Sequence, residues 1–278
     1  MNLPNALESA TLELSNENYA SAEEKLREIL AERPDDSDVL GLLGLACGAQ
    51  DKFDQSSHFF ERAVRIRPNH ETVSNFAASL SRLGRFEEAI QVYRQSLAFR
   101  PDSAAGHRNI GLCLSKANRT VEAESEFREA IRLKPDYVEA LNNLWSQLAR
   151  EDRHAEALEI STKMLALRPH DPDVWNAHGI DLHFSGRSAK AVKAYSEALR
   201  LNPAHANARF NLGSAQLSLG DLKNGWVNYG ARWDSHESKP PAMRVPAWNG
   251  SELSGKTILL WAEQGLGDSI QFIRYAKD

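Results

Sequence analysis

The chain has 278 residues, 42% of them hydrophobic, and a formal net charge of -5. The acidic balance argues against nucleic acid as a partner, because nucleic-acid binding usually requires a basic stripe. The N-terminus has no apolar run of signal-peptide or membrane-spanning length, and the two cysteines do not indicate a disulfide framework, so we expect a soluble cytoplasmic protein without membrane insertion.

A proline recurs with an almost constant period in the first part of the chain. The intervals are 34, 33, 34, 34 and 34 residues, between Pro34, Pro68, Pro101, Pro135, Pro169 and Pro203. Each proline is expected to end a helix, because it lacks an N–H and clashes with the preceding turn. Residue types that tolerate a left-handed helix C-cap lie about midway between them, at Asp51, Gly84, Asn118, Asp152, Gly186 and Gly220. The period predicts a repeated helix–turn–helix unit.

Small and large apolar residues follow the same register. The small residues are Ala22, Ser56, Ala89, Ala123, Ala157 and Ala191. A large apolar residue follows four places later, except at Ser161, giving Leu26, Phe60, Tyr93, Phe127 and Tyr195. Glycines recur early in the unit, at Gly44, Gly111, Gly179 and Gly213. Small residues let two helices approach closely, and the aromatic rings are expected to fill the space between neighbouring helix pairs.

Together these features resemble the tetratricopeptide repeat, a helix–turn–helix unit of 34 residues. The resemblance extends from about Leu3 to Trp233. It implies an all-α fold for residues 1–233, a right-handed α-solenoid of about seven helix pairs with the seventh degenerate. In this family the first helix of each pair lines a concave groove.

Asparagines recur at one position of the first helices that packing does not dictate. They are Asn75, Asn109, Asn143 and Asn211, and the missing member is Ala177, beside Asn176. The row resembles the asparagine ladder of the O-linked N-acetylglucosamine transferase superhelix, which implies that the amides hold the backbone of an extended peptide. An amide both donates and accepts, so it can pair with a peptide unit of any sequence. The alternative is that each asparagine caps or bonds to a neighbouring helix.

A second row, Arg82, Lys116 and Arg150, lies near the C-terminal ends of the first helices. These cations could meet acidic side chains of a bound segment, but the helix macrodipole by itself favours solvated cations there, and we prefer that interpretation. The densest histidine cluster, His178 and His183 with Asp181, does not have metal-ligand spacing, because two ligands on one helix face need to lie four residues apart. We therefore predict no metal site.

The pattern changes after Gly220. Residues 234–254 are rich in proline and glycine, which predicts a linker. In residues 255–278 the apolar run KTILLW predicts a buried strand, Gly265 and Gly267 predict a tight turn, and SIQFIRYAK restarts a helical pattern. The glycines do not match the dinucleotide-binding fingerprint, because the third glycine would fall at Ile270.

The string from Gly225 to Ala276 resembles the junction between tetratricopeptide repeats and a heptosyltransferase-like, GT-B glycosyltransferase domain in bacterial proteins. This resemblance implies that residues 255–278 begin a Rossmann-like domain, that a full-length parent uses a nucleotide sugar, and that Asp268 is a candidate base for an acceptor hydroxyl. One β–α unit cannot form a sheet, so we expect this chain to be a fragment or truncated product without enzymatic activity or a cofactor of its own.

Three functional hypotheses remain open. The first is a module whose concave groove binds a protein or extended peptide, as the recognition part of a larger protein. The second is the N-terminal portion of a bacterial glycosyltransferase. The third is a scaffold that self-associates through the exposed end of the solenoid or through the unpaired strand predicted at KTILLW.

Overall fold

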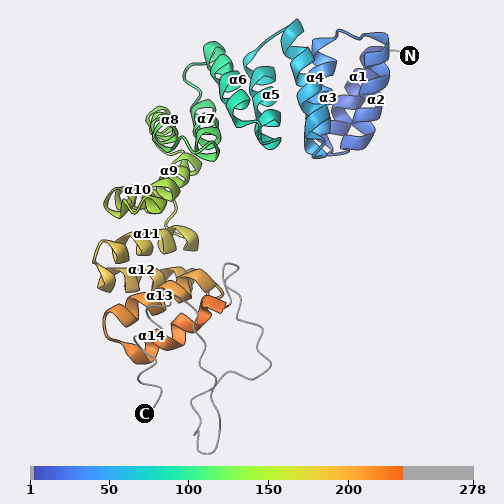
Figure 1. Ribbon diagram of the computed structural model, residues 1–278. Coiled ribbons are helices and arrows are strands. Elements are labelled where there is room, and N and C mark those ends of the chain that lie inside the picture. Colours follow the sequence, from blue (N-terminus) through green and yellow to red (C-terminus); the bar gives the residue numbers. More distant parts are fainter. Residues whose placement is uncertain (1–2, 234–278) are drawn as a thin grey trace, which may run out of the picture. The chain divides into compact units, whose positions relative to one another are not determined.

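The computed structural model describes residues 3–233, which form α-helices and one short 3-10 helix and contain no strand (Figure 1). The helices are α1 (Leu3–Ser15), α2 (Tyr19–Glu32), α3 (Ser37–Ala49), α4 (Phe53–Ile66), α5 (His70–Arg82), α6 (Phe86–Phe99), α7 (Ala104–Lys116), α8 (Thr120–Leu133), α9 (Val138–Arg150), α10 (His154–Leu167), α11 (Pro172–Phe184), α12 (Ser188–Leu201), α13 (Ala206–Ser218) and α14 (Leu222–Tyr229). The 3-10 helix is Gly230–Trp233.

Successive helices pack as pairs, α1 with α2 through α13 with α14, and the second helix of each pair packs on the first helix of the next. The predicted all-α arrangement of seven helix pairs is therefore confirmed for the described residues. The linker predicted at 234–254 and the β–α unit predicted at 255–278 lie outside them, together with Gly265, Gly267 and Asp268.

The periodic prolines end the second helices as predicted. For example, α2 ends at Glu32 and α8 ends at Leu133, each two residues before a proline. All six residues predicted for the left-handed turns have positive φ, between 56° at Asp152 and 83° at Gly220. The first pair uses Glu17 (φ 61°) at the same place, which the sequence does not predict because glutamate rarely adopts this conformation.

Three of the early glycines, Gly44, Gly111 and Gly179, make room for the aromatic rings of their own helix pairs, whereas Gly213 lies against the backbone of α14. A Cβ added at Gly111 would lie 2.6 Å from Phe127 Cε1, and one added at Gly179 would lie 2.5 Å from Tyr195 Cε1. Real Cβ contacts are not this short, so these glycines are required for the helices to pack. The contact of each ring with a glycine of its own pair is not part of the prediction, which placed the rings between neighbouring pairs.

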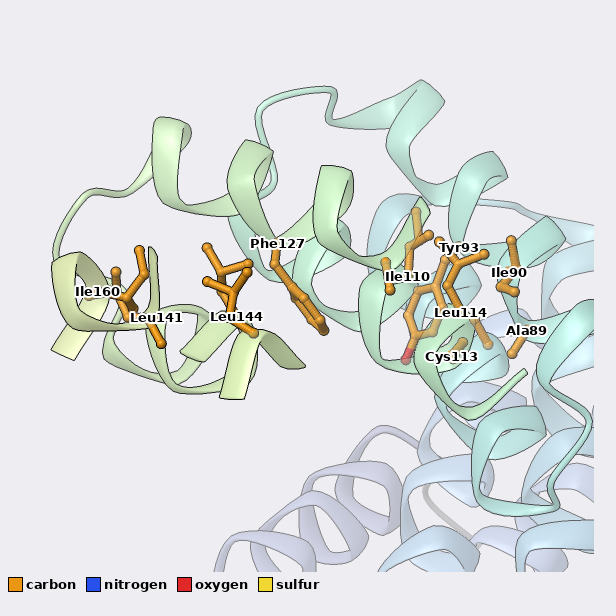
Figure 2. Close-up of a cluster of buried hydrophobic side chains, with 14 of the residues drawn as sticks. Ala89, Ile90, Tyr93, Ile110, Cys113, Leu114, Phe127, Leu141, Leu144 and Ile160 are labelled. Carbon is orange, nitrogen blue, oxygen red and sulfur yellow. The ribbon is translucent and has the colours of Figure 1, made fainter. Parts of the chain in front are cut away.

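Buried apolar side chains form three clusters along the repeats. The largest cluster runs from Ala77 on α5 to Val174 on α11, and Figure 2 shows its labelled members in a row from Ala89 to Ile160. Phe127, between the fourth and fifth pairs, is 1% exposed. The core therefore continues across pair boundaries, as expected when a single pair cannot bury its own apolar surface.

Candidate functional site on the first-helix face

Side chains on α5, α7, α9, α11 and α13 form a surface that we call the first-helix face. These helices contact one another across the pair boundaries, directly for α5 with α7 and α11 with α13. Polar caps fix where several of them begin. Ser103 Oγ accepts a hydrogen bond from Gly106 N at the start of α7, and Asp171 accepts one from Asp173 N at the start of α11.

The four predicted asparagines are partly exposed members of this face. Arg108 on α7 joins two of them, since its guanidinium donates to Oδ1 of Asn109 (3.3 Å) and to Oδ1 of Asn143 on α9 (3.1 Å). Asn211 Nδ2 on α13 donates to Oδ1 of Asn176 on α11 (2.9 Å). In the sixth pair, where Ala177 occupies the asparagine position of the repeat, the neighbouring Asn176 thus supplies an amide instead.

The asparagines differ in how many hydrogen bonds their side-chain amides already form with neighbouring side chains. Burial raises the pKa of Tyr93, and a hydrogen bond from the Asn109 side chain opposes that shift. Asn109 and Asn211 therefore bond to neighbouring helices, as the alternative interpretation expects. Within residues 3–232, in contrast, no hydrogen bond involves the side chain of Asn75 or the Nδ2 of Asn143.

The basic row lies at the last turns of α5, α7 and α9. Arg82 forms an ion pair with Asp51 (3.4 Å), and its guanidinium lies 4.7 Å from the centre of the Phe53 ring. Arg150 donates to Ser146 O (3.2 Å). All three cations are exposed, and this position is the one that the helix macrodipole favours.

The histidines near Asp181 do not converge. His178 Nδ1 lies 3.3 Å from Ser161 Oγ, whereas His183 Nδ1 lies 3.0 Å from Ser188 Oγ. Burial lowers the pKa of both imidazoles. In the described part of the chain, no three His, Cys, Asp or Glu side chains are placed to hold a metal ion.

A buried polar contact connects the fifth and sixth pairs, and the sequence does not predict it. Asp181 on α11 is fully buried and accepts a hydrogen bond from Trp145 on α9. His154 Nδ1 lies 3.6 Å from the other carboxylate oxygen of Asp181, which has no hydrogen bond. Burial raises the pKa of Asp181, and the contacts with Ser161, Trp145 and His154 oppose that shift. The sequence does carry one signal of this contact. In the fifth pair the large Trp145 stands at the glycine position of the repeat, and the small Ser161 stands at the aromatic position.

Among residues 3–233, no helix combines the length and apolar character needed to cross a membrane.

Solved structures with a similar fold are helical repeat proteins. A tetratricopeptide repeat protein from Parabacteroides merdae aligns with a TM-score of 0.63 at 17% identity, over 85% of this chain and 94% of that one. The C-terminal part of a TPR repeat-containing protein from Cytophaga hutchinsonii gives 0.70 at 14% identity, over 84% and 96%. YrrB, described as a TPR protein with an unusual peptide-binding site, gives 0.56 at 19% identity, over 65% and 93%. These likenesses show the fold.

Curated relatives match over one short region each. The peroxisomal targeting signal receptor of Candida glabrata is 36% identical over 78 residues, which is 28% of this chain and 13% of the receptor. Protein FlbA of Caulobacter vibrioides is 33% identical over 75 residues, or 26% and 13%. The chain thus spans only a small part of the length of these relatives.

Two sequence profiles, both described as tetratricopeptide repeat, match residues 75–138 with 176–225 and residues 13–80. Together they cover more than half of the chain and agree with the helix pairs and their turns. The chain belongs to the tetratricopeptide repeat family.

Proposed function

We propose that the chain is a peptide-binding module and that the asparagines of the first-helix face pair with the backbone of an extended segment. The observation that carries the proposal is the recurrence of partly exposed amides on successive first helices, two of which keep hydrogen-bonding capacity unused by residues 3–232. A backbone amide and carbonyl would be satisfied by one asparagine side chain, whatever the side chains of the segment are.

The contacts of Arg108 support this role. Its guanidinium holds Oδ1 of Asn109 and Oδ1 of Asn143, so the orientation of both amides is set before a ligand arrives. The Nδ2 of Asn143 is then directed to donate elsewhere. An ordered amide loses less conformational entropy on binding, which strengthens the complex. YrrB and the peroxisomal receptor, whose descriptions name peptide or signal binding, make a peptide ligand a reasonable choice.

The experiment begins with a selection of random peptides, displayed on phage, against the full chain. Affinities of the selected peptides are then measured by calorimetry for the wild type and for Asn75→Ala/Asn143→Ala. These two asparagines are chosen because neighbouring side chains use them least. Each lost amide pair removes about 0.5–1.5 kcal/mol, so the double variant should bind about tenfold or more weakly.

Asn142→Ala is the matched control, because Asn142 is an exposed asparagine on α9 outside the row. It should leave the affinity unchanged. Unaltered affinity in an Asn75→Ala/Asn143→Ala protein that shows wild-type circular dichroism would contradict the proposal.

A second candidate function rests on the sequence from Gly225 to Ala276 alone. Its likeness to a glycosyltransferase junction suggests that a longer protein containing this chain transfers sugar from a nucleotide-sugar donor, with the repeats selecting the acceptor. Such a protein should hydrolyse or transfer a nucleotide sugar, and Asp268→Asn should suppress the transfer while donor binding remains. A complete protein inactive with all nucleotide sugars would remove this candidate.

A further inference from the structure

A cleft of about 560 Å³ opens beside the second helices α10 and α12. Residues of α10, α11 and α12 line it. Three of the lining side chains are the cations Arg187, Lys190 and Lys193. The boundary between the preceding second helices, α8 and α10, provides the comparison that shows why these cations are unusual.

Two ion pairs cross the boundary between α8 and α10 and balance charge there. Arg153, at the start of α10, pairs with Glu124 on α8 (2.6 Å). Arg128 on α8 pairs with Glu156 on α10 (3.2 Å). Each of these four residues has a counterpart 34 places later in the chain.

The first ion pair is lost at the boundary between α10 and α12. Arg187 is the counterpart of Arg153, but Leu158 stands where Glu124 would be required. Both Leu158 and Arg187 line the cleft. The guanidinium therefore keeps its position at the start of α12 while its carboxylate partner is replaced by an apolar side chain.

The second ion pair is also lost, and its acidic member is reversed in charge. Thr162 is the counterpart of Arg128, and Lys190 is the counterpart of Glu156. A further lysine, Lys193, stands at the counterpart of Glu159. At the boundary between α10 and α12, the register residues thus give a concentration of positive charge within an acidic chain, where the preceding boundary has ion pairs.

No carboxylate of the described residues neutralises this charge. Within residues 3–232, Arg187, Lys190 and Lys193 form neither an ion pair nor a side-chain hydrogen bond. The one acidic residue of the lining, Glu197, is engaged with Arg200 (2.6 Å). Three cations at the rim of a partly enclosed space attract an anionic ligand, because their fields add and the protein wall reduces screening by water.

The rest of the lining is largely apolar. Leu158, Trp175 and Leu182 contribute to it. The indole of Trp175 is fixed by a hydrogen bond from Nε1 to Pro169 O (2.8 Å). His178 also lines the cleft, and burial lowers the pKa of its imidazole, which favours the neutral form there. A ligand that fits this lining carries an apolar group beside its negative charges.

We propose that this cleft binds an acidic peptide segment, whose carboxylates pair with Arg187, Lys190 and Lys193 while an apolar side chain contacts Leu158 and Trp175. At the preceding boundary, Glu124 and Glu156 supply negative charge. The carboxylates of the peptide would supply it here, where Leu158 and Lys190 occupy the matching positions. No asparagine of the row lines this cleft, so the proposal does not rest on the proposed function.

The test uses a fluorescein-labelled synthetic peptide in which one leucine is flanked by glutamates on both sides. Binding to the full chain is followed by fluorescence anisotropy at low salt. The decisive variant is Thr162→Arg/Lys190→Glu, which copies the Arg128–Glu156 ion pair into the cleft and so preserves the packing of α10 on α12. The affinity for the peptide should fall by about tenfold or more, whereas Lys223→Gln on α14, with the same change in net charge, should have no effect.

Three further arms identify the ligand class. A peptide with lysines in place of the glutamates should not bind, and replacing its leucine by serine should weaken binding of the acidic peptide. Asn75→Ala/Asn143→Ala should bind the acidic peptide like the wild type, which separates this site from the asparagine row. Equal affinity of the wild type and Thr162→Arg/Lys190→Glu would overturn the proposal. Failure of the glutamate peptide to bind would also overturn it, even if a phosphoserine peptide binds.

Discussion

The indole Nε1 of Trp145 on α9 donates a hydrogen bond of 2.8 Å to Oδ2 of Asp181 on α11, a carboxylate without solvent exposure. In the fifth pair, Trp145 stands at the position where most other pairs have glycine, and Ser161 stands at the position where most have an aromatic residue. This pair therefore differs chemically from its neighbours. Its indole reaches across the pair boundary and makes a buried polar contact with the sixth pair.

Trp145→Phe should lower the free energy of unfolding by about 1–3 kcal/mol, because it leaves a buried carboxylate oxygen without its indole donor. Trp175→Phe is the matched control. Its indole donates to Pro169 O at an exposed position, where water can take over the bond. Equal losses in urea unfolding of the two variants would contradict the importance of the Asp181 contact.

Gly179→Ala should destabilise the protein by about 1–3 kcal/mol, because its new Cβ would overlap the Tyr195 ring. Gly41→Ala on α3 makes the same chemical change where the nearest atom, Thr72 Cγ2, is at 3.7 Å. It should be neutral or stabilising by about 0.5–1 kcal/mol, since alanine favours the helix. Thermal unfolding followed by circular dichroism compares the stability of the two variants. A stabilising effect of Gly179→Ala would contradict the prediction, because it would show that α11 and α12 can move apart without cost.

Gly186→Ala should cost about 1–2 kcal/mol, although nothing lies within 4 Å of its added Cβ, because φ is 75° there. The reverse change in the turn two pairs earlier, Asn118→Gly at φ 60°, should relieve rather than add strain. Chemical denaturation of both variants tests this. If both substitutions lowered stability equally, the backbone conformation would not be the cause.

Glu23 should make stability depend on pH. Burial alone would raise the pKa of Glu23, but hydrogen bonds from Lys52, Arg27 and Gln50 outweigh it and lower the pKa from 4.5 to about 2. The carboxylate therefore contributes stability that is fully present above pH 4.5 and is lost as the pH falls through 2.

Glu23→Gln should lower the free energy of unfolding by about 1–3 kcal/mol at neutral pH, and its difference from the wild type should shrink as the solution is acidified. Urea unfolding at a series of pH values measures both effects. Glu24→Gln, at an exposed neighbouring position, serves as control and should show neither. A difference that stays constant down to the lowest pH would mean that the Glu23 charge is not responsible.

The sequence predicts best those features that depend on the backbone preference of a single residue. Pro135 must end a helix and Asn118 suits a left-handed turn, so both could be placed without knowing any neighbour. Small and aromatic residues also repeat in register, but the register alone does not predict that Tyr195 contacts Gly179 of its own pair.

Contacts between side chains of different helices are harder to predict. Nothing near Asn109 in the sequence indicates that Tyr93 shares its amide, and nothing near Glu23 indicates that Lys52 pairs with it (2.8 Å). Both contacts depend on how adjacent pairs stack. The cleft lined by Arg187, Lys190 and Lys193 is hard to predict for another reason. Lys190 is unusual only when it is compared with Glu156, which stands at the same position of the preceding repeat.

The central claim is that asparagine amides of the first-helix face hold a peptide backbone. It is tested most directly by a double-mutant cycle between Asn143→Ala and replacement of single peptide bonds of a selected peptide by an alkene, which removes the carbonyl that Nδ2 of Asn143 would bond to. If the claim is right, the alkene at one position and Asn143→Ala will each weaken binding, and the combined loss will be smaller than the sum by about 0.5–1.5 kcal/mol. Strictly additive losses at every replaced peptide bond would contradict it, because the Asn143 amide and the backbone would then not be in contact.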